Sequence, residues 1–291
     1  SNLANISFEE GSKLKSIGET AFARTNLVSI DIPEGVEWIG EDAFVAATMA
    51  SINVSADNAT YTSDDGILFS KDKKTLVFYP QNRAAKSYTL PAGVEALANC
   101  AFMVQYDDLV TNLETLNLDN GSLKTIGSRA FANLRWVKEV AIPDTVEKMG
   151  AAVFSSADSL TTVHLPENGK LEFIPDSMFQ FCGLLTTVNI PSSVKTLETD
   201  AFLECDALSA VTLPEGLETI AEGAFDGCGQ LTTVNFPQSL KRIGAGAFQV
   251  TRIDTVDLSA TSVEIIDDGA FALSYTKHVK MPGRSLQKMG E

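Results

Sequence analysis

A small residue followed by phenylalanine recurs along the whole chain, and this internal repeat constrains the fold more than any other feature of the sequence. The phenylalanines that carry this marker are Phe22, Phe44, Phe102, Phe131, Phe154, Phe179, Phe202, Phe225, Phe248 and Phe271. From Phe179 onward the markers are 23 residues apart, and an aliphatic residue before proline keeps step with them, as at Leu213-Pro214. A unit this short cannot bury its own apolar face, so the units must stack into a solenoid with a shared core.

The copy over residues 208–230 shows what each unit contributes to that core. Val211 and Leu213 alternate with smaller and polar residues, which is typical of a strand with one buried face, and Pro214 ends the strand. Phe225 then inserts an aromatic ring at the same phase of the unit. With neighbouring strands about 4.8 Å apart, roughly twelve coils predict a solenoid about 55 to 60 Å long.

These residues resemble the BspA-like leucine-rich repeat family, whose unit reads approximately Leu-x-x-Ile-x-Ile-Pro-x-x-Val-x-x-Ile-Gly-x-x-Ala-Phe-x-x-Cys. The resemblance covers nearly the whole chain. It implies a β-rich, right-handed leucine-rich-repeat solenoid of about twelve coils with one β-hairpin insertion. We expect a single solenoid over residues 1–291.

The insertion is expected between Phe44 and Phe102, which are 58 residues apart, where two regular coils would take 46. Residues 55–87 contain two apolar runs around a turn-like polar segment, which predicts a hairpin. The resemblance implies a family ornament, and the alternative is an aromatic patch that anchors a protein partner. A second extended loop is expected over residues 103–112. The candidate contact residues are Trp38, Tyr61, Phe69, Phe78, Tyr79 and Tyr106.

Both ends of the sequence fall inside a repeat unit. Residues 3–8 already have the phase of a strand, and the last coil stops at Glu291, just before its Ala-Phe marker. Terminal coils of solenoids normally need a polar cap. We therefore expect the chain to be truncated at both ends, with any export signal in the missing N-terminal part.

The charge balance argues against two classes of partner. The chain has 22 Lys and Arg against 38 Asp and Glu, giving a formal net charge of −16 and a sequence pI of about 4.5. Nucleic acids and anionic membranes both require a basic surface, so neither is expected as a partner. No stretch approaches the roughly 18 to 20 apolar residues of a membrane-spanning helix.

The four cysteines give no clear sign of a metal or redox site. Cys182, Cys205 and Cys228 each follow the repeat phenylalanine by three residues and form a column, whereas Cys100 stands outside it. We expect buried core thiols in this column, with a disulfide between neighbours as the alternative. A zinc site would need four convergent ligands, and the sequence contains no Cys-x-x-Cys pair.

The histidines and acidic pairs point to no catalytic centre either. His164 and His278 are expected on the exposed face of strands five coils apart, which is too far for a shared site. Acidic pairs such as Asp267-Asp268 lack the ligand spacing of a calcium loop. We therefore expect no catalytic residues, no metal and no cofactor.

The function expected from the resemblance is a non-catalytic binding module. The resemblance implies a bacterial secreted or cell-surface adhesin-type protein that contacts host or microbial proteins, such as components of the extracellular matrix. Two alternatives stay open: a carbohydrate-binding module that uses its Asn- and Thr-rich face, and a structural spacer or accessory region of a longer surface protein.

Overall fold

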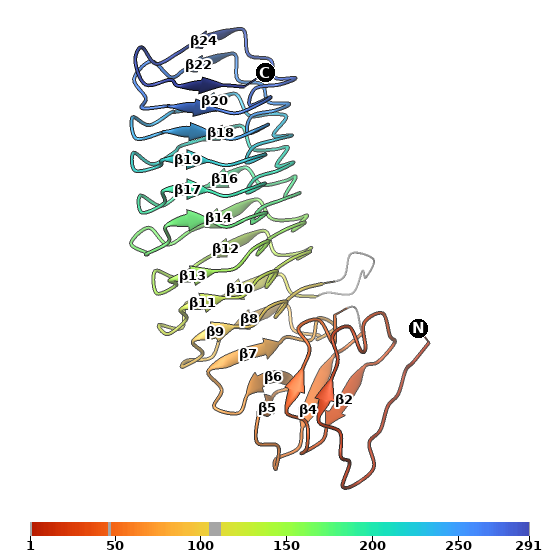
Figure 1. Cartoon of the computed structure of the whole chain (residues 1–291). Helices are drawn as coiled ribbons and strands as arrows, with labels where there is room; N and C mark the ends of the chain where they lie inside the picture. The colour runs from red at the N-terminus through yellow and green to blue at the C-terminus, as the bar shows by residue number, and fades with distance from the viewer. Residues whose placement is uncertain (1, 46–47, 105–111, 291) are drawn as a thin grey trace.

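The computed structural model describes residues 2–45, 48–104 and 112–290, and these residues form a β-solenoid of about twelve turns without a helix (Figure 1). The two ends of the chain lie at opposite ends of the stack (Figure 1). The solenoid predicted from the repeat is confirmed.

One side of the stack is formed by strands of two to four residues, named here the long strands, which begin in the first half of each coil. They are β2 (Ser29–Ile32), β4 (Ser51–Val54), β8 (Ser87–Thr89), β10 (Thr115–Asn117), β12 (Glu139–Ala141), β14 (Thr162–His164), β16 (Thr187–Val188), β18 (Ala210–Val211), β20 (Thr233–Val234), β22 (Thr255–Asp257) and β24 (His278–Lys280). These strands pair in parallel and in register within the sets β2–β4, β8–β10, β12–β14–β16, β18–β20 and β22–β24, so Glu139 lies opposite Thr162, which lies opposite Thr187. Apolar residues such as Val140 and Val163, which lie between these outward positions, are buried, whereas Val279 in β24 is 43% exposed. The alternation predicted for the unit is therefore present.

A second side is formed by two-residue strands that follow the proline turn. They are β1 (Ser16–Ile17), β3 (Trp38–Ile39), β9 (Ala96–Leu97), β11 (Thr125–Ile126), β13 (Lys148–Met149), β15 (Phe173–Ile174), β17 (Thr196–Leu197), β19 (Thr219–Ile220), β21 (Arg242–Ile243), β23 (Ile265–Ile266) and β25 (Lys288–Met289). In each of these strands up to β23 the second residue points into the core and is buried. Trp38 and Phe173 occupy the first, outward position of their strands, opposite Ser16 and Thr196 respectively.

The third side of each coil is the turn around the Ala-Phe marker. Some of its backbone hydrogen bonds go to the next coil and others stay within the turn. Phe202 N–H and Glu204 N–H donate to carbonyls of the next coil, each at 2.8 Å, whereas Leu203 N–H donates back to Asp200 O at 3.0 Å. Asp200 and Glu204 have positive φ, 55° and 57°. The next coil has glycines at these positions, Gly223 and Gly227, because glycine adopts positive φ without strain. The turn thus satisfies its backbone groups without a helix or strand.

The repeat phenylalanines form a continuous column of rings, as the stacking of coils requires. Between Phe131 and Phe271 successive ring centroids are 5.1 to 5.7 Å apart. The column does not run through the whole molecule, however. The buried apolar residues separate into a main core and a smaller N-terminal core, which includes Phe22, Phe44 and Phe78. In Figure 1 the strands β2 and β4 run at a steep angle to those of the main stack.

The insertion lies at the joint between these two cores. It comprises β5 (Tyr61–Asp64), β6 (Ile67–Ser70) and β7 (Thr75–Phe78), which pair in antiparallel fashion, so it has three strands where the sequence predicts a hairpin of two. β7 also pairs in parallel with β9 and thereby joins the ladder of short strands. Asp65 and Gly66 form the turn between β5 and β6, and both have positive φ, 47° and 73°, as a two-residue type I′ hairpin requires.

Candidate partner-binding surfaces

Three of the predicted contact residues are buried, and the prediction that they leave an aromatic patch exposed is wrong. Phe69 and Tyr79 lie in the main core, and Phe78 lies in the N-terminal core. The reason is that strands β6 and β7 are sandwiched between the two cores. Leu68 faces the N-terminal core while its neighbours face the main one, so both faces of the insertion are covered.

Trp38 and Tyr61 lie at the edge of the joint. The Trp38 side chain is 47% exposed and remains a candidate contact residue. Tyr61 is half-buried, and its hydroxyl accepts a hydrogen bond of 3.1 Å from Ile39 N–H in β3. Partial burial raises the pKa of Tyr61 above its usual value. Tyr106, with most of the predicted 103–112 loop, lies outside the described residues.

Three large apolar side chains in the middle of the main stack are exposed and were not predicted. Trp136, Phe181 and Leu184 are 50%, 48% and 54% exposed. Trp136 and Leu184 each stand three residues before paired strand positions, at Glu139 and Thr187, so they share one phase of the repeat two coils apart. About 10 Å therefore separates them along the stack. We name Trp136, Phe181 and Leu184 the mid-stack patch. Comparing the residues at the same phase of successive coils would have found the patch, because the coil between those of Trp136 and Leu184 has the small polar Ser159 at this phase.

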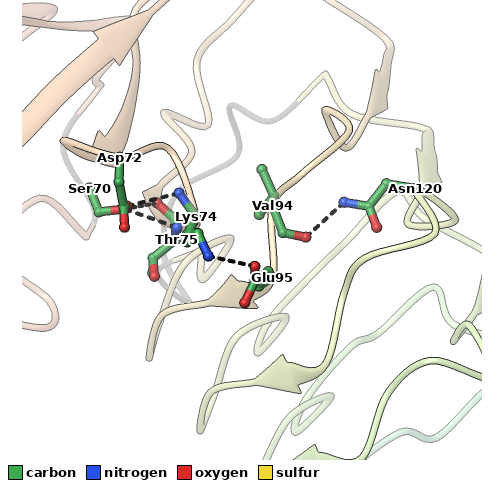
Figure 2. Close-up of polar contacts among 7 residues, drawn as sticks. All are labelled: Ser70, Asp72, Lys74, Thr75, Val94, Glu95 and Asn120. Carbon is green, nitrogen blue, oxygen red and sulfur yellow. Dashed lines mark hydrogen bonds and ion pairs between the residues drawn. The ribbon is translucent and has the colours of Figure 1, made fainter.

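The turn between β6 and β7 is held by polar contacts and not by apolar ones (Figure 2). Ser70 Oγ donates to Asp72 Oδ1 at 2.7 Å and accepts from Thr75 N–H at 2.9 Å. Lys74 Nζ forms an ion pair of 2.8 Å with Glu95 in the next coil (Figure 2). This hydrogen-bonded ion pair lowers the pKa of the Glu95 carboxyl and raises the pKa of the Lys74 ammonium group. The turn is therefore an ordered structural element.

Carboxylates gather on the Ala-Phe side of the main stack. Partial burial raises the pKa of Asp200, and nearby carboxylates add to this shift; they belong to Asp176, Glu222 and Asp226. Partial burial also raises the pKa of Asp226, against the opposing effect of the hydrogen bond that Gln249 donates to it at 3.2 Å. This side therefore has a concentrated negative field and disfavours acidic partners.

The cysteine column is a set of free, buried thiols, as expected. Each Sγ donates to the carbonyl of a repeat phenylalanine at 3.0 to 3.1 Å: Cys182 to Phe154, Cys205 to Phe179 and Cys228 to Phe202. Burial raises the pKa of Cys182 to about 12, so the thiol stays protonated at neutral pH. These groups are core side chains and not nucleophiles.

The described part of the chain contains neither a cluster of metal ligands nor a membrane-spanning helix. His164 and His278 are exposed on their strands, as expected, and His164 Nε2 lies 2.9 Å from a carboxylate oxygen of Glu139. In residues 2–45, 48–104 and 112–290, no three His, Cys, Asp or Glu side chains are grouped so that they could hold a metal ion. Nor do these residues include a helix that could span a bilayer.

The repeat geometry agrees with a family model described as a BspA type leucine-rich repeat region, which matches in six copies over residues 1–69, 77–209 and 201–291. The chain belongs to the BspA-type leucine-rich repeat family. The unmatched residues 70–76 comprise the last residue of β6, the turn between β6 and β7, and the start of β7. Leucine-rich repeat domains generally mediate protein–protein interaction. No curated protein matches the chain.

Solved structures of bacterial leucine-rich repeat proteins have the same fold. A leucine-rich repeat protein from Eubacterium ventriosum is 28% identical, with a TM-score of 0.78 over 86% of this chain and 65% of that protein. One from Bacteroides ovatus is 25% identical, with a TM-score of 0.56 over 92% of this chain and 70% of that protein. A leucine-rich cell surface protein from Faecalibacterium prausnitzii is 24% identical, with a TM-score of 0.54, covering 76% and 51% of the two chains. This BspA-type chain thus spans less than two thirds of the Eubacterium protein's length.

Proposed function

We propose that this BspA-type solenoid is a non-catalytic protein-binding module of a bacterial cell-surface or secreted protein, which contacts proteins of a host or of neighbouring microbes. The observation that supports it most directly is the mid-stack patch. Large apolar side chains at the surface of a stable scaffold are typical contact residues, because covering them releases water without reordering the backbone. The description of the Faecalibacterium protein as a cell surface protein supports the location.

The stack suits a binding role because its recognition residues are held in place. Trp136, Phe181 and Leu184 project from coils whose backbone groups bond to the coils on either side, as in the bond of 2.8 Å from Phe181 N–H to Leu203 O. A preorganised surface loses little conformational entropy on association. Trp38 extends the candidate contact surface toward the N-terminal end.

The test is capture of matrix and host-surface proteins by the purified chain, compared with the double variant Trp136→Ala/Leu184→Ala. The matched control is Thr187→Ala/Thr233→Ala, which alters exposed residues of the long strands. We expect the patch variant to lose at least about tenfold in affinity and the control to bind normally. Equal capture by both variants would exclude the patch, and capture of glycans alone on a glycan array would favour the carbohydrate-binding alternative.

A further inference from the structure

The ladder of short strands is interrupted after β3. In the main stack the short strands that are followed by a paired strand accept two backbone hydrogen bonds from the next coil; for example, Thr125 N–H donates to Glu95 O at 3.2 Å and Gly127 N–H donates to Leu97 O at 2.9 Å. β3 pairs only with β1, and no backbone N–H in the described residues donates to Glu37 O or Ile39 O. Because the chain departs into the insertion at this point, the β3 edge lacks its next strand.

One backbone N–H on this edge has a side-chain acceptor in place of the missing strand. Ile39 N–H would donate to a carbonyl of the next strand, but it donates to the Tyr61 hydroxyl. A second break, between β13 and β15, has a different cause, since Pro175 stands at the position of Gly127 and has no N–H. At the break after β3, therefore, the backbone acceptors Glu37 O and Ile39 O are present, but the strand that would donate to them is missing.

A cavity of about 320 Å³ opens beside this edge. Its lining includes Ile39 and Gly40, Leu97 and Ala98 of the main stack, and the rings of Phe44 and Phe78. Glu41 also lines the cavity, and its carboxylate accepts a hydrogen bond of 2.7 Å from Asn99 Nδ2. The lining is thus mainly apolar with one carboxylate, and the cavity is large enough for an aliphatic side chain with part of its backbone.

The charges along the short strands indicate what would fill the gap. Along most of the column the residue before each short strand alternates in sign, as in the ion pair of 2.5 Å between Lys15 and Glu37. The exceptions are Glu172, which follows Glu147 across the break between β13 and β15, and the uncharged Gln287. In the main stack Glu95 lies between Lys74 and Lys124, and both lysines lower the pKa of its carboxyl. Glu37 has a lysine on one side only. A basic residue in the gap would continue the alternation.

We propose that the β3 edge binds an extended segment of a protein partner as an added parallel strand, with a basic residue opposite Glu37 and an aliphatic residue two positions later that enters the cavity. The N–H groups of that segment donate to Glu37 O and Ile39 O, as Thr125 and Gly127 do for Glu95 and Leu97, and a carbonyl of the segment replaces the Tyr61 hydroxyl as the acceptor of Ile39 N–H. The exposed Trp38 ring flanks the segment. This inference rests on the proposed protein-binding function and names the chemistry of one contact.

The chain's own repeat supplies the probe, because Lys124-Thr125-Ile126-Gly127 has the required pattern. A fluorescein-labelled peptide Leu-Lys-Thr-Ile-Gly-Ser is titrated with the intact chain by fluorescence anisotropy. We expect saturable binding below about 1 mM. Replacing the peptide isoleucine by aspartate should weaken binding more than about tenfold, and N-methylation of its glycine about fivefold.

A charge exchange locates the site on the chain. Glu37→Lys should weaken the lysine peptide about threefold and strengthen a peptide with glutamate at that position by a similar factor, whereas Glu215→Lys, a distant exposed control, should change neither. No saturable binding, or binding insensitive to the isoleucine, overturns the proposal. So does sedimentation showing that the chain self-associates and that the peptide dissociates the dimer, since the occupant is then a second copy. If the chain binds the peptide but captures no protein, the proposed function is overturned and the edge site stands. If the chain captures a protein but does not bind the peptide, only the edge site is overturned.

Discussion

Phe78 and Tyr79 are adjacent in the chain, yet their rings belong to different hydrophobic cores. Phe78 packs against Phe44 of the N-terminal core with ring centroids 5.7 Å apart, and Tyr79 stacks on Phe102 of the main core at 4.9 Å. Two neighbouring residues of a strand point to opposite faces, so the end of β7 joins the two stacks. The column of repeat rings changes direction here.

This joint predicts that Phe78→Ala loosens the N-terminal stack alone. Loss of a buried ring costs about 3 to 5 kcal/mol, and in solenoids such losses fall on neighbouring repeats. Hydrogen exchange followed by mass spectrometry should show faster exchange over residues 16–54 with little change beyond Phe173. The matched variant Phe225→Ala should loosen the main stack around residues 196–257. A uniform increase along the whole chain in both variants would mean that the two cores unfold as one unit.

The sequence was sufficient for the solenoid but not for this joint. The strand positions follow from the alternation at Val211 and Leu213, and the column of rings follows from the 23-residue spacing. The burial of Phe69 and Phe78 depends on a second core packing on the far face of the insertion. The continuous run Ile67-Leu68-Phe69 was a signal of this, because strands buried on both faces do not alternate. The exposed aromatics were missed because Trp136 breaks the repeat at a position that is not part of the consensus unit.

The backbone conformation of one turn predicts that Val250 can be replaced by glycine without loss of stability. This residue is 42% exposed and has φ of 56°, a conformation that is strained for a β-branched side chain. Val250→Gly relieves the strain, so we expect no loss of stability or a gain of up to about 1 kcal/mol by urea unfolding. Val28 is similarly exposed but has ordinary φ, and Val28→Gly should cost about 0.5 to 1 kcal/mol. Equal losses in both variants would mean that the turn at Val250 is not under strain.

The four buried cysteines should not react with thiol reagents until the chain unfolds. Burial raises the pKa of Cys100 to about 11 and that of Cys182 to about 12, so at pH 8 about one thiol in a thousand or fewer is ionised. Ellman's reagent should therefore label none of the four cysteines in the native protein and all four in urea. Leu184→Cys places a thiol on the exposed mid-stack patch and should react at once. Fast labelling of the native parent chain would show that the coils open locally.

Replacing aspartate by asparagine should have opposite effects on stability at Asp200 and Asp257. The raised pKa of Asp200 means that its charge opposes folding at neutral pH, in full above its folded pKa and not at all below the ordinary aspartate pKa of about 3.9. Asp200→Asn should therefore raise the melting temperature at pH 7, with the gain shrinking as the pH falls toward about 4. Asparagine also tolerates the positive φ of Asp200, but this contribution does not vary with pH.

Asp257 provides the matched control, since the hydrogen bonds from Lys280 and Ser259 lower its pKa to about 2. Its charge stabilises the fold above about pH 3.9, and this contribution is lost as the pH falls toward about 2. Asp257→Asn should lower the melting temperature at pH 7, with a difference that narrows in acid. High salt should reduce only the part of the Asp200→Asn gain that comes from repulsion by neighbouring carboxylates, because salt screens this repulsion but does not change the burial of Asp200. A gain that is independent of pH and salt would assign it to backbone conformation alone.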